Sequence, residues 1–185
     1  MNGVDAVILT GGFAHGDYLR CGAIARFSPI MKAVSEFASA GGPVLGICNG
    51  FQVLTESGLL PGALYKNAGL KFLCKDVEVR VESTNSALTN DASVGNILHL
   101  AINHFEGNYQ CDPETLAELK GNDRILLRYT NNPNGAVDDI AGICNEMRNV
   151  VGLMPHPERA SSQLNGNTDG QTLIRSVLAF AGARV

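Results

Sequence analysis

The chain has 185 residues, a formal net charge of −4 and 45% hydrophobic residues, which is typical of one globular domain with a sizeable core. The acidic balance argues against a surface for nucleic acid or for an acidic membrane, and no apolar run is long enough to span a bilayer. The first residues lack the basic flank of a signal peptide, and the five scattered cysteines form no C-x-x-C pair. We therefore expect a cytoplasmic chain with neither a disulfide framework nor a metal site.

The first sixty residues alternate between strand-like and helix-like segments. Two short apolar runs predict buried parallel strands, and each is followed by a segment that predicts a helix. The first helix has Ser28 as its N-cap and Pro29 at its first position. This order is typical of a parallel sheet with helices packed on it. The strands are predicted at residues 5–10 and 43–47, and the helices at residues 28–40 and 49–57.

After residue 60 the pattern contains more strands. Residues 77–83, VEVRVES, alternate between apolar and polar side chains, which suggests an exposed or edge strand. Asp112 and Pro113 mark the start of a short helix. No repeat or linker interrupts the chain, so we predict a single α/β domain over residues 1–185. The further strands are predicted at residues 97–102, 124–130, 140–144 and 149–154, and the further helices at residues 112–120 and 168–182.

The stretch GICNG, residues 46–50, places a cysteine between two glycines where a predicted strand meets a helix. A thiol there faces a helix N-terminus, whose N–H groups and dipole favour the thiolate. The two glycines let strand and helix approach each other, so G-x-C-x-G is the cysteine form of the nucleophile elbow. The backbone N–H of Asn49 would then point at an oxyanion formed on a carbonyl that Cys48 attacks. The alternative is a buried cysteine that simply ends a core strand.

A nucleophilic cysteine needs a base, and His156 follows an apolar strand, where α/β sheets build their sites. Glu158 comes two residues later, and the two flanking prolines predict an extended segment in which both side chains share a face. The carboxylate would fix the imidazole tautomer while the other ring nitrogen reaches Cys48. The alternative is a proline-rich turn with a surface ion pair to Arg159.

Together, GICNGFQ and GLMPHPERA resemble the motifs of the class I, or triad-type, glutamine amidotransferases. Longer stretches resemble more narrowly the small glutaminase subunit of phosphoribosylformylglycinamidine synthase, and the likeness runs over nearly the whole chain. The resemblance implies a flavodoxin-like α/β fold: a mostly parallel sheet with helices on both faces and added antiparallel strands. The stretches are GGFAHGDYLRCGAIARFSP, GICNGFQVLTESGLLPGAL, HFEGNY, NPNG with IAGICNE, and TDGQTLIRSVL.

The resemblance also assigns roles to residues. Cys48 would be the nucleophile, His156 the acid and base, and Glu158 the group that orients the imidazole. The backbone N–H groups of Gly12 and Asn49 would form the oxyanion hole. Three further residues would help to hold the amino-acid end of glutamine, although a structural role is an equal alternative for the histidine: Gln52, Asn103 and His104.

The implied reaction is the hydrolysis of L-glutamine to glutamate and ammonia through a glutamyl thioester. The chain itself would need no cofactor. Ammonia would pass to a separate formylglycinamidine ribonucleotide synthetase subunit, which uses ATP and magnesium, and a small third subunit would bridge the two. We expect low activity from the isolated chain.

The sequence departs from the family pattern in three places. Family members begin with another strand, a loop and a helix, about 30 residues that this sequence lacks. Either Met1 is a mis-assigned or engineered start or the chain is a short form, and in both cases we expect the neighbouring strands to expose an edge. Thr10 stands where proline is common, and Phe105 where the family loop has glycine.

Other functions fit part of the same pattern. The chemistry could serve an amidotransferase of another pathway or a stand-alone γ-glutamyl hydrolase. A non-catalytic subunit that only docks on a synthetase is a further alternative, against which the intact triad argues.

Overall fold

The structure is a computed structural model that describes residues 3–17 and 20–182; residues 18 and 19 of the quoted DYLRCG stretch lie outside this description. The strands are β1 (Val7–Leu9), β2 (Val44–Ile47), β3 (Ala63–Tyr65), β4 (Leu73–Val81), β5 (Ile97–His104), β6 (Asn108–Gln110), β7 (Ile125–Tyr129), β8 (Ile140–Cys144) and β9 (Val150–Leu153). The α-helices are α1 (Pro29–Ser39), α2 (Asn49–Glu56), α3 (Pro113–Gly121) and α4 (Gly170–Gly182). Short 3₁₀ helices are η1 (Ala14–Asp17), η2 (Ala25–Phe27), η3 (Val137–Asp139), η4 (Pro157–Ala160) and η5 (Gln163–Asn165).

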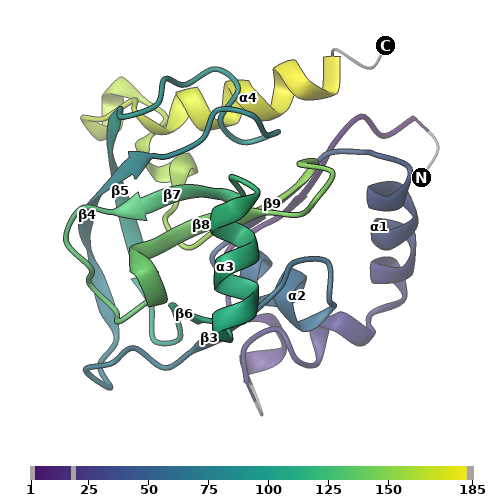
Figure 1. The fold of residues 1–185 in the computed structure, drawn as a ribbon, viewed down its shortest axis with the longest axis horizontal. Coiled ribbons are helices and arrows are strands. Elements are labelled where there is room, and N and C mark those ends of the chain that lie inside the picture. Colours follow the sequence, from purple (N-terminus) through teal and green to yellow (C-terminus); the bar gives the residue numbers. More distant parts are fainter. Residues whose placement is uncertain (1–2, 18–19, 183–185) are drawn as a thin grey trace.

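The described strands form two sheets (Figure 1). The large sheet has seven strands in the order β1-β2-β9-β8-β7-β4-β5, and β3 pairs with β6 in a small antiparallel sheet. Helix α2 packs on β1, β2 and β9, whereas α4 packs on η4 and β5. The α/β fold and the added antiparallel strands agree with the expectation from the sequence.

Parallel pairing covers a smaller part of the sheet than the sequence led us to expect. Only β1–β2 and β2–β9 are parallel among the described strands, and the other pairs of the large sheet are antiparallel. The reason is the length of the connections. A parallel pair needs a crossover of about a dozen residues or more, whereas the short turn at residues 145–149 lets β8 and β9 pair only as antiparallel neighbours.

Strand β4 lies inside the sheet, between β7 and β5. The prediction of an exposed or edge strand was therefore wrong about its position. The alternation itself is real: Val77, Val79 and Val81 are buried, and Glu78 and Arg80 between them are exposed. Period-two alternation reports that one face of a strand is buried, and it carries no information about the number of neighbouring strands.

Strand β1 forms one edge of the large sheet in the described part of the chain. It pairs with β2 on one side only, and the side chain of Ile8 is 51% exposed. Leu178 of α4 is also exposed, and it lines the same apolar cavity as Ile8. The surface beside β1 is thus more apolar than is usual for the edge of a sheet.

The parallel pairing of β2 with β9 positions the candidate site. Ile47 at the end of β2 pairs with Leu153 at the end of β9, and the backbone N–H of Cys48 donates to the carbonyl of Leu153 at 2.8 Å. Because parallel strands end at the same edge of a sheet, Cys48 and His156 leave the sheet side by side. The fold thus brings together two residues that are more than one hundred positions apart.

Candidate active site

Cys48 occupies the sharp turn between β2 and α2, with φ 51° and ψ −105°. A side chain other than glycine rarely adopts a positive φ, and such strain is typical of functional turns. The neighbouring glycines are required for the turn. A Cβ atom on Gly50 would lie 2.0 Å from the backbone oxygen of Leu9, and one on Gly46 would lie 2.8 Å from the carbonyl carbon of Gly50. The turn therefore has the geometry that the G-x-C-x-G spacing predicts.

His156 is held by its backbone and by one carboxylate. Its N–H donates to the carbonyl of Ala101 at 2.8 Å, which ties the segment after β9 to β5. Its Nδ1 atom lies 2.6 Å from Oε1 of Glu158. A carboxylate accepts only, so Nδ1 carries the hydrogen and Nε2 is the basic nitrogen of the neutral ring. The ring is buried, while the Glu158 side chain is 47% exposed.

The carboxyl group of Glu158 remains ionised beside this ring. Partial burial acts to raise its pKa, but the hydrogen bond from His156 and the positive charges of His156 and Arg159 outweigh that effect. The pKa of Glu158 consequently lies below its ordinary value. An ionised partner stabilises the imidazolium that forms when a histidine takes up a proton.

The segment after His156 differs from the prediction. Residues Pro157–Ala160 form the 3₁₀ helix η4 rather than an extended stretch, and only His156 keeps extended dihedral angles. Pro157 occupies the first helical position, where its fixed φ and missing N–H are tolerated. The two side chains still meet, because the turn of the helix brings the Glu158 carboxylate to Nδ1 of the ring.

All three residues of the predicted triad line one cavity of about 430 Å³. Gly11 shows how close its members are: a Cβ atom there would lie 2.7 Å from Cε1 of His156 and 3.6 Å from Cβ of Cys48. The imidazole and the nucleophile therefore pack against the same side of one glycine. The sequence marked Gly11 only as the end of a strand, although the Gly-Gly pair was a signal of close approach. The cavity is lined by, among others, Gly11, Gly12, Cys48, Asn103, His156 and Glu158.

The two proposed oxyanion residues lie close to the nucleophile: Asn49 follows Cys48 in the chain, and Gly12 lines the same cavity as Cys48. Gly12 and Asn49 both line an adjoining cavity of about 420 Å³. Asn49 is the first residue of α2, so its N–H belongs to the donors at the helix N-terminus. Its side-chain oxygen accepts from the N–H of Ala14 at 3.2 Å, which ties the loop after β1 to the start of α2. This arrangement can place two backbone N–H groups near the oxyanion that forms when Cys48 attacks a carbonyl.

The three residues predicted to hold glutamine are placed differently. Asn103 lines the catalytic cavity, and its carbonyl accepts from the thiol of Cys48 at 3.8 Å. Gln52 is buried and turned toward the loop after β5, where its Nε2 donates to the carbonyl of Glu106 at 2.5 Å. Its Oε1 accepts from the side chain of Asn49 at 2.8 Å. Among the described residues that line the catalytic cavity, Gln52 is not included.

His104 is also turned away from the catalytic cavity. It is 2% exposed, and its Nδ1 lies 3.1 Å from Oδ1 of Asn67. Burial lowers the pKa of His104 to about 4, and the nearby charge of His156 acts in the same direction. The ring is therefore neutral near pH 7, as expected for the structural role that the sequence left open.

Of the two smaller departures from the family pattern, Thr10 lies at this site and Phe105 lies in the turn after β5. Thr10 lines the catalytic cavity, and Phe105 is part of the loop that follows Asn103. The Phe105 ring lies 5.9 Å from the ammonium nitrogen of Lys66. Over residues 3–17 and 20–182 no cluster of side chains could hold a metal ion, and no helix is long and apolar enough to cross a membrane.

Comparison with known proteins agrees with this geometry. The CobB/CobQ-like glutamine amidotransferase domain matches residues 1–181. The PurQ subunit of phosphoribosylformylglycinamidine synthase from Koribacter versatilis is 56% identical over 189 residues, covering 97% of this chain and 82% of the relative. The subunit of the same name from Rubrobacter xylanophilus is 58% identical over 185 residues, covering 100% of this chain and 83% of the relative. These likenesses favour the purine synthase subunit over amidotransferases of other pathways.

Solved structures lead to the same family. The structure of PurLQS from Thermotoga maritima matches with a TM-score of 0.89 and 40% identity, covering 97% of this chain and 81% of that chain. The glutaminase domain of CTPS from Trypanosoma brucei, at 16% identity and a TM-score of 0.62, shares the fold. The chain therefore belongs to the CobB/CobQ-like glutamine amidotransferase family and, within it, to the PurQ glutaminase subunits of phosphoribosylformylglycinamidine synthase.

Proposed function

We propose that Cys48, His156 and Glu158 form the catalytic triad with which this subunit hydrolyses glutamine. The observation that carries the proposal is their shared cavity, in which the Glu158 carboxylate holds the ring and Gly11 contacts both the ring and Cys48. The strained turn at Cys48 supports it as well, because strain of this kind persists only where the surroundings enforce it.

In the proposed reaction Nε2 of His156 takes the thiol proton, and the sulfur of Cys48 attacks the side-chain amide carbon of glutamine. The amide oxygen becomes an oxyanion, which the backbone N–H groups of Gly12 and Asn49 stabilise. The imidazolium then gives its proton to the departing nitrogen, so that ammonia leaves and a glutamyl thioester remains. Water that loses a proton to His156 attacks the thioester, which releases glutamate and restores the thiol.

The ammonia serves a second subunit in this proposal. The solved relative from Thermotoga maritima is a PurLQS assembly, so its PurQ chain is accompanied by two other subunits. We assign the ATP- and magnesium-dependent synthesis of formylglycinamidine ribonucleotide to one of these partners and a bridging role to the small one. The present chain then acts in the cytoplasm as a single amidotransferase domain without a cofactor of its own.

A covalent label tests the triad directly. The chain is reconstituted with its partner subunits and incubated with a glutamine-mimicking diazoketone, and the modified residue is identified by mass spectrometry. We expect an adduct on Cys48 and none after Cys48→Ala. Cys74→Ala removes an exposed thiol outside the cavity and should be labelled like the wild type.

The same complex shows whether the label reports function. Cys48→Ala should abolish amidine formation from glutamine but retain formation from added ammonia, because the synthetase reaction does not use this thiol. A wild-type complex that carries no adduct and makes no amidine from glutamine would support the non-catalytic docking role instead.

A further inference from the structure

The Asn103–Gly107 loop, which comprises the last two residues of β5 and the turn that follows, presents two backbone carbonyls to Cys48 and to helix α2. The carbonyl of Asn103 accepts from the Cys48 thiol at 3.8 Å, and the carbonyl of Glu106 accepts from Nε2 of Gln52 at 2.5 Å. The loop thus contacts the nucleophile and the helix that follows it. Its position therefore determines the shape of the cavity on the side of Asn103.

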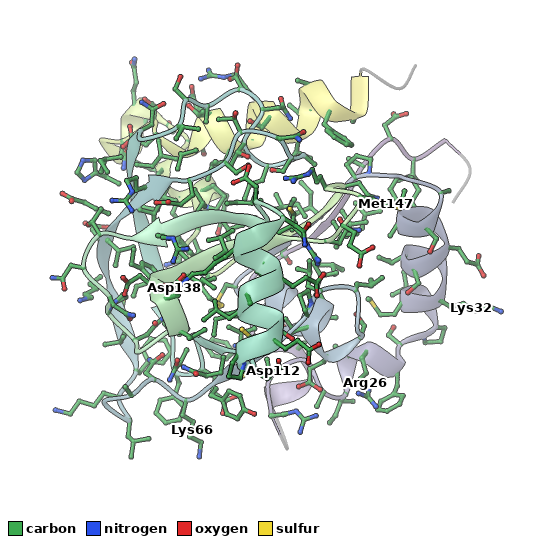
Figure 2. The ribbon with its side chains drawn as sticks, viewed as in Figure 1. Arg26, Lys32, Lys66, Asp112, Asp138 and Met147 are labelled. Atoms are coloured by element: carbon green, nitrogen blue, oxygen red, sulfur yellow. The ribbon has the colours of Figure 1, made fainter. Side chains whose placement is uncertain are left out.

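The outer side of this loop faces solvent. Glu106 lines a hollow of about 630 Å³ together with Arg26 and Lys66, which both project from the lower side of the molecule in Figure 2. Oε2 of Glu106 accepts from the N–H of Cys21 at 3.3 Å, which is longer than a typical N–H···O bond. Phe105 and Glu106 are half-buried, whereas His104 and Gly107 are buried and are held by bonds on the inner side of the loop.

Asn67, which lies between β3 and β4, makes those inner bonds. Its backbone N–H donates to the carbonyl of Phe105 at 2.9 Å, and its side-chain nitrogen donates to the carbonyl of His104 at 3.0 Å. Its side-chain oxygen accepts from the N–H of Gly107 at 3.2 Å and lies 3.1 Å from Nδ1 of His104. Asn67 is 1% exposed, and its side chain and backbone together bind His104, Phe105 and Gly107.

The hydrogen-bonding capacity of this amide is fully used. The nitrogen has two hydrogens, and its second one goes to the carbonyl of Lys71 at 2.8 Å. The oxygen has two lone pairs, and it meets the N–H of Gly107 and the ring of His104. Asparagine is the residue that supplies both donors and both acceptor sites at this length. A buried amide with every bond made holds its partners in one arrangement.

The neighbouring residues fit this arrangement closely. A Cβ atom on Gly107 would lie 2.2 Å from Cε1 of His104, so the ring packs directly on the glycine. The side-chain nitrogen of Asn134, also buried, donates to the carbonyl of Gly107 at 2.8 Å. Two asparagines from separate segments therefore hold the same end of the loop.

We infer that Asn67 is a positioning residue of the glutaminase site: it holds the loop Asn103–Gly107 so that the loop carbonyls and Asn103 complete the glutamine pocket. The inference rests on the proposed function, because it concerns the same cavity. Asn67 acts through the loop and does not line the catalytic cavity as described. Its loss should leave the triad intact but loosen one wall of the pocket, which weakens glutamine binding before it slows the chemistry.

The test compares two buried asparagines in the reconstituted complex. Asn67→Ala removes the side-chain bonds to His104 and Gly107 but keeps the backbone bond to Phe105. Asn149→Ala is the matched control: Asn149 is equally buried and donates to the carbonyls of Ala38 and Gly42 at 2.8 and 2.7 Å, at the opposite end of the β2–β9 pair. Both variants should unfold at a lower temperature than the wild type. Only Asn67→Ala should raise the KM for glutamine, about tenfold or more, with a smaller change in kcat.

Asn67→Asp and Asn134→Ala refine the test. The aspartate keeps an acceptor for Gly107 but loses both donors, and we expect a rise in KM close to that of Asn67→Ala. Asn134→Ala removes one bond to the loop and should raise KM less, and it provides a folded variant if Asn67→Ala does not fold. Ammonia-dependent synthesis should be unchanged in all variants.

The outcomes separate the two proposals. An active wild-type complex in which Asn67 and Asn149 variants share the same KM would overturn the positioning role and leave the triad standing. The same conclusion follows if Asn134→Ala and Asn67→Asp both bind glutamine like the wild type. A wild-type complex that hydrolyses no glutamine would overturn the proposed function, and the positioning role with it.

Discussion

Gly11 shows how a single residue can control the relation between a base and a nucleophile. It follows β1, and its Cα side faces both the ring of His156 and the methylene of Cys48. Because glycine has no Cβ atom, the ring and the nucleophile can both pack closely against this position. Next to it, Gly12 has a φ of 152°, and a side chain there would meet no atom within 4 Å. The two glycines are therefore needed for different reasons, the first for space and the second for its backbone conformation.

We predict that Gly11→Ala reduces glutamine hydrolysis by about 100-fold or more. The added methyl group would lie 2.7 Å from Cε1 of His156, so the ring must move, and small misplacements of a catalytic group cost about that factor. Gly69→Ala is the control, because a Cβ atom there meets nothing within 4 Å. Steady-state kinetics and thermal unfolding of both variants check the prediction. Equal activity of Gly11→Ala and Gly69→Ala would contradict it.

At the scale of elements, helix α2 begins directly after the strained Cys48. Gln52, near the start of the helix, contacts the loop after β5. Its approach to β1 is so close that Gly50 has no room for a side chain. The chain of side-chain bonds from Ala14 through Asn49 and Gln52 to Glu106 crosses the same helix end. Helix α2 therefore fixes the distance between the loop after β1 and the loop after β5.

Gly50→Ala should destabilise the fold, because its methyl group would lie 2.0 Å from the carbonyl oxygen of Leu9. Either α2 or β1 must shift, and overpacking of this kind costs about 1–3 kcal/mol. Gly121→Ala, at the end of α3 with open space around it, should be neutral or slightly stabilising. Urea unfolding measures both free energies. A Gly50→Ala variant as stable as the wild type would show that the strand and the helix separate without cost.

At the scale of the whole molecule, burial of His104 couples stability to pH. The folded protein holds the pKa of His104 at about 4, below the ordinary value of 6.5, mainly because of burial and also because of electrostatic repulsion from His156. Between these two values the unfolded chain binds a proton that the folded chain does not. The contribution of the neutral His104 ring to the free energy of unfolding is therefore fully present above about pH 6.5, and it is lost as the pH falls toward 4.

We predict that His104→Gln flattens this dependence. Between pH 7 and pH 4 the free energy of unfolding of the wild type should fall by up to about 3 kcal/mol more than that of the variant, because the variant has no ring to protonate. Urea unfolding of both proteins across this range gives the difference, in which the shared carboxyl groups largely cancel. Parallel stability curves for the two proteins would contradict the assignment of the acid-sensitive group to His104.

Local patterns in the sequence predicted much of this protein. Apolar runs, N-caps and glycine positions depend on neighbours in the chain, so the strands at Val44–Ile47 and Val150–Leu153 and the start of α3 at Asp112 could be expected. The cysteine between two glycines, and the histidine followed by a glutamate, identified the three triad candidates for the same reason. Their spacing reflects a turn and a short helix, both of which involve only a few residues.

Only the tertiary structure decided which way the other polar side chains face and how the strands pair. Gln52 and His104 could have turned to the cavity or to the loop, and the choice depends on Glu106 and Asn67, which are 54 and 37 positions away. The roles of Gly11 and Asn67 likewise come from contacts between segments far apart in the chain. A sequence pattern records which groups a segment offers, whereas long-range packing determines which partners each group meets.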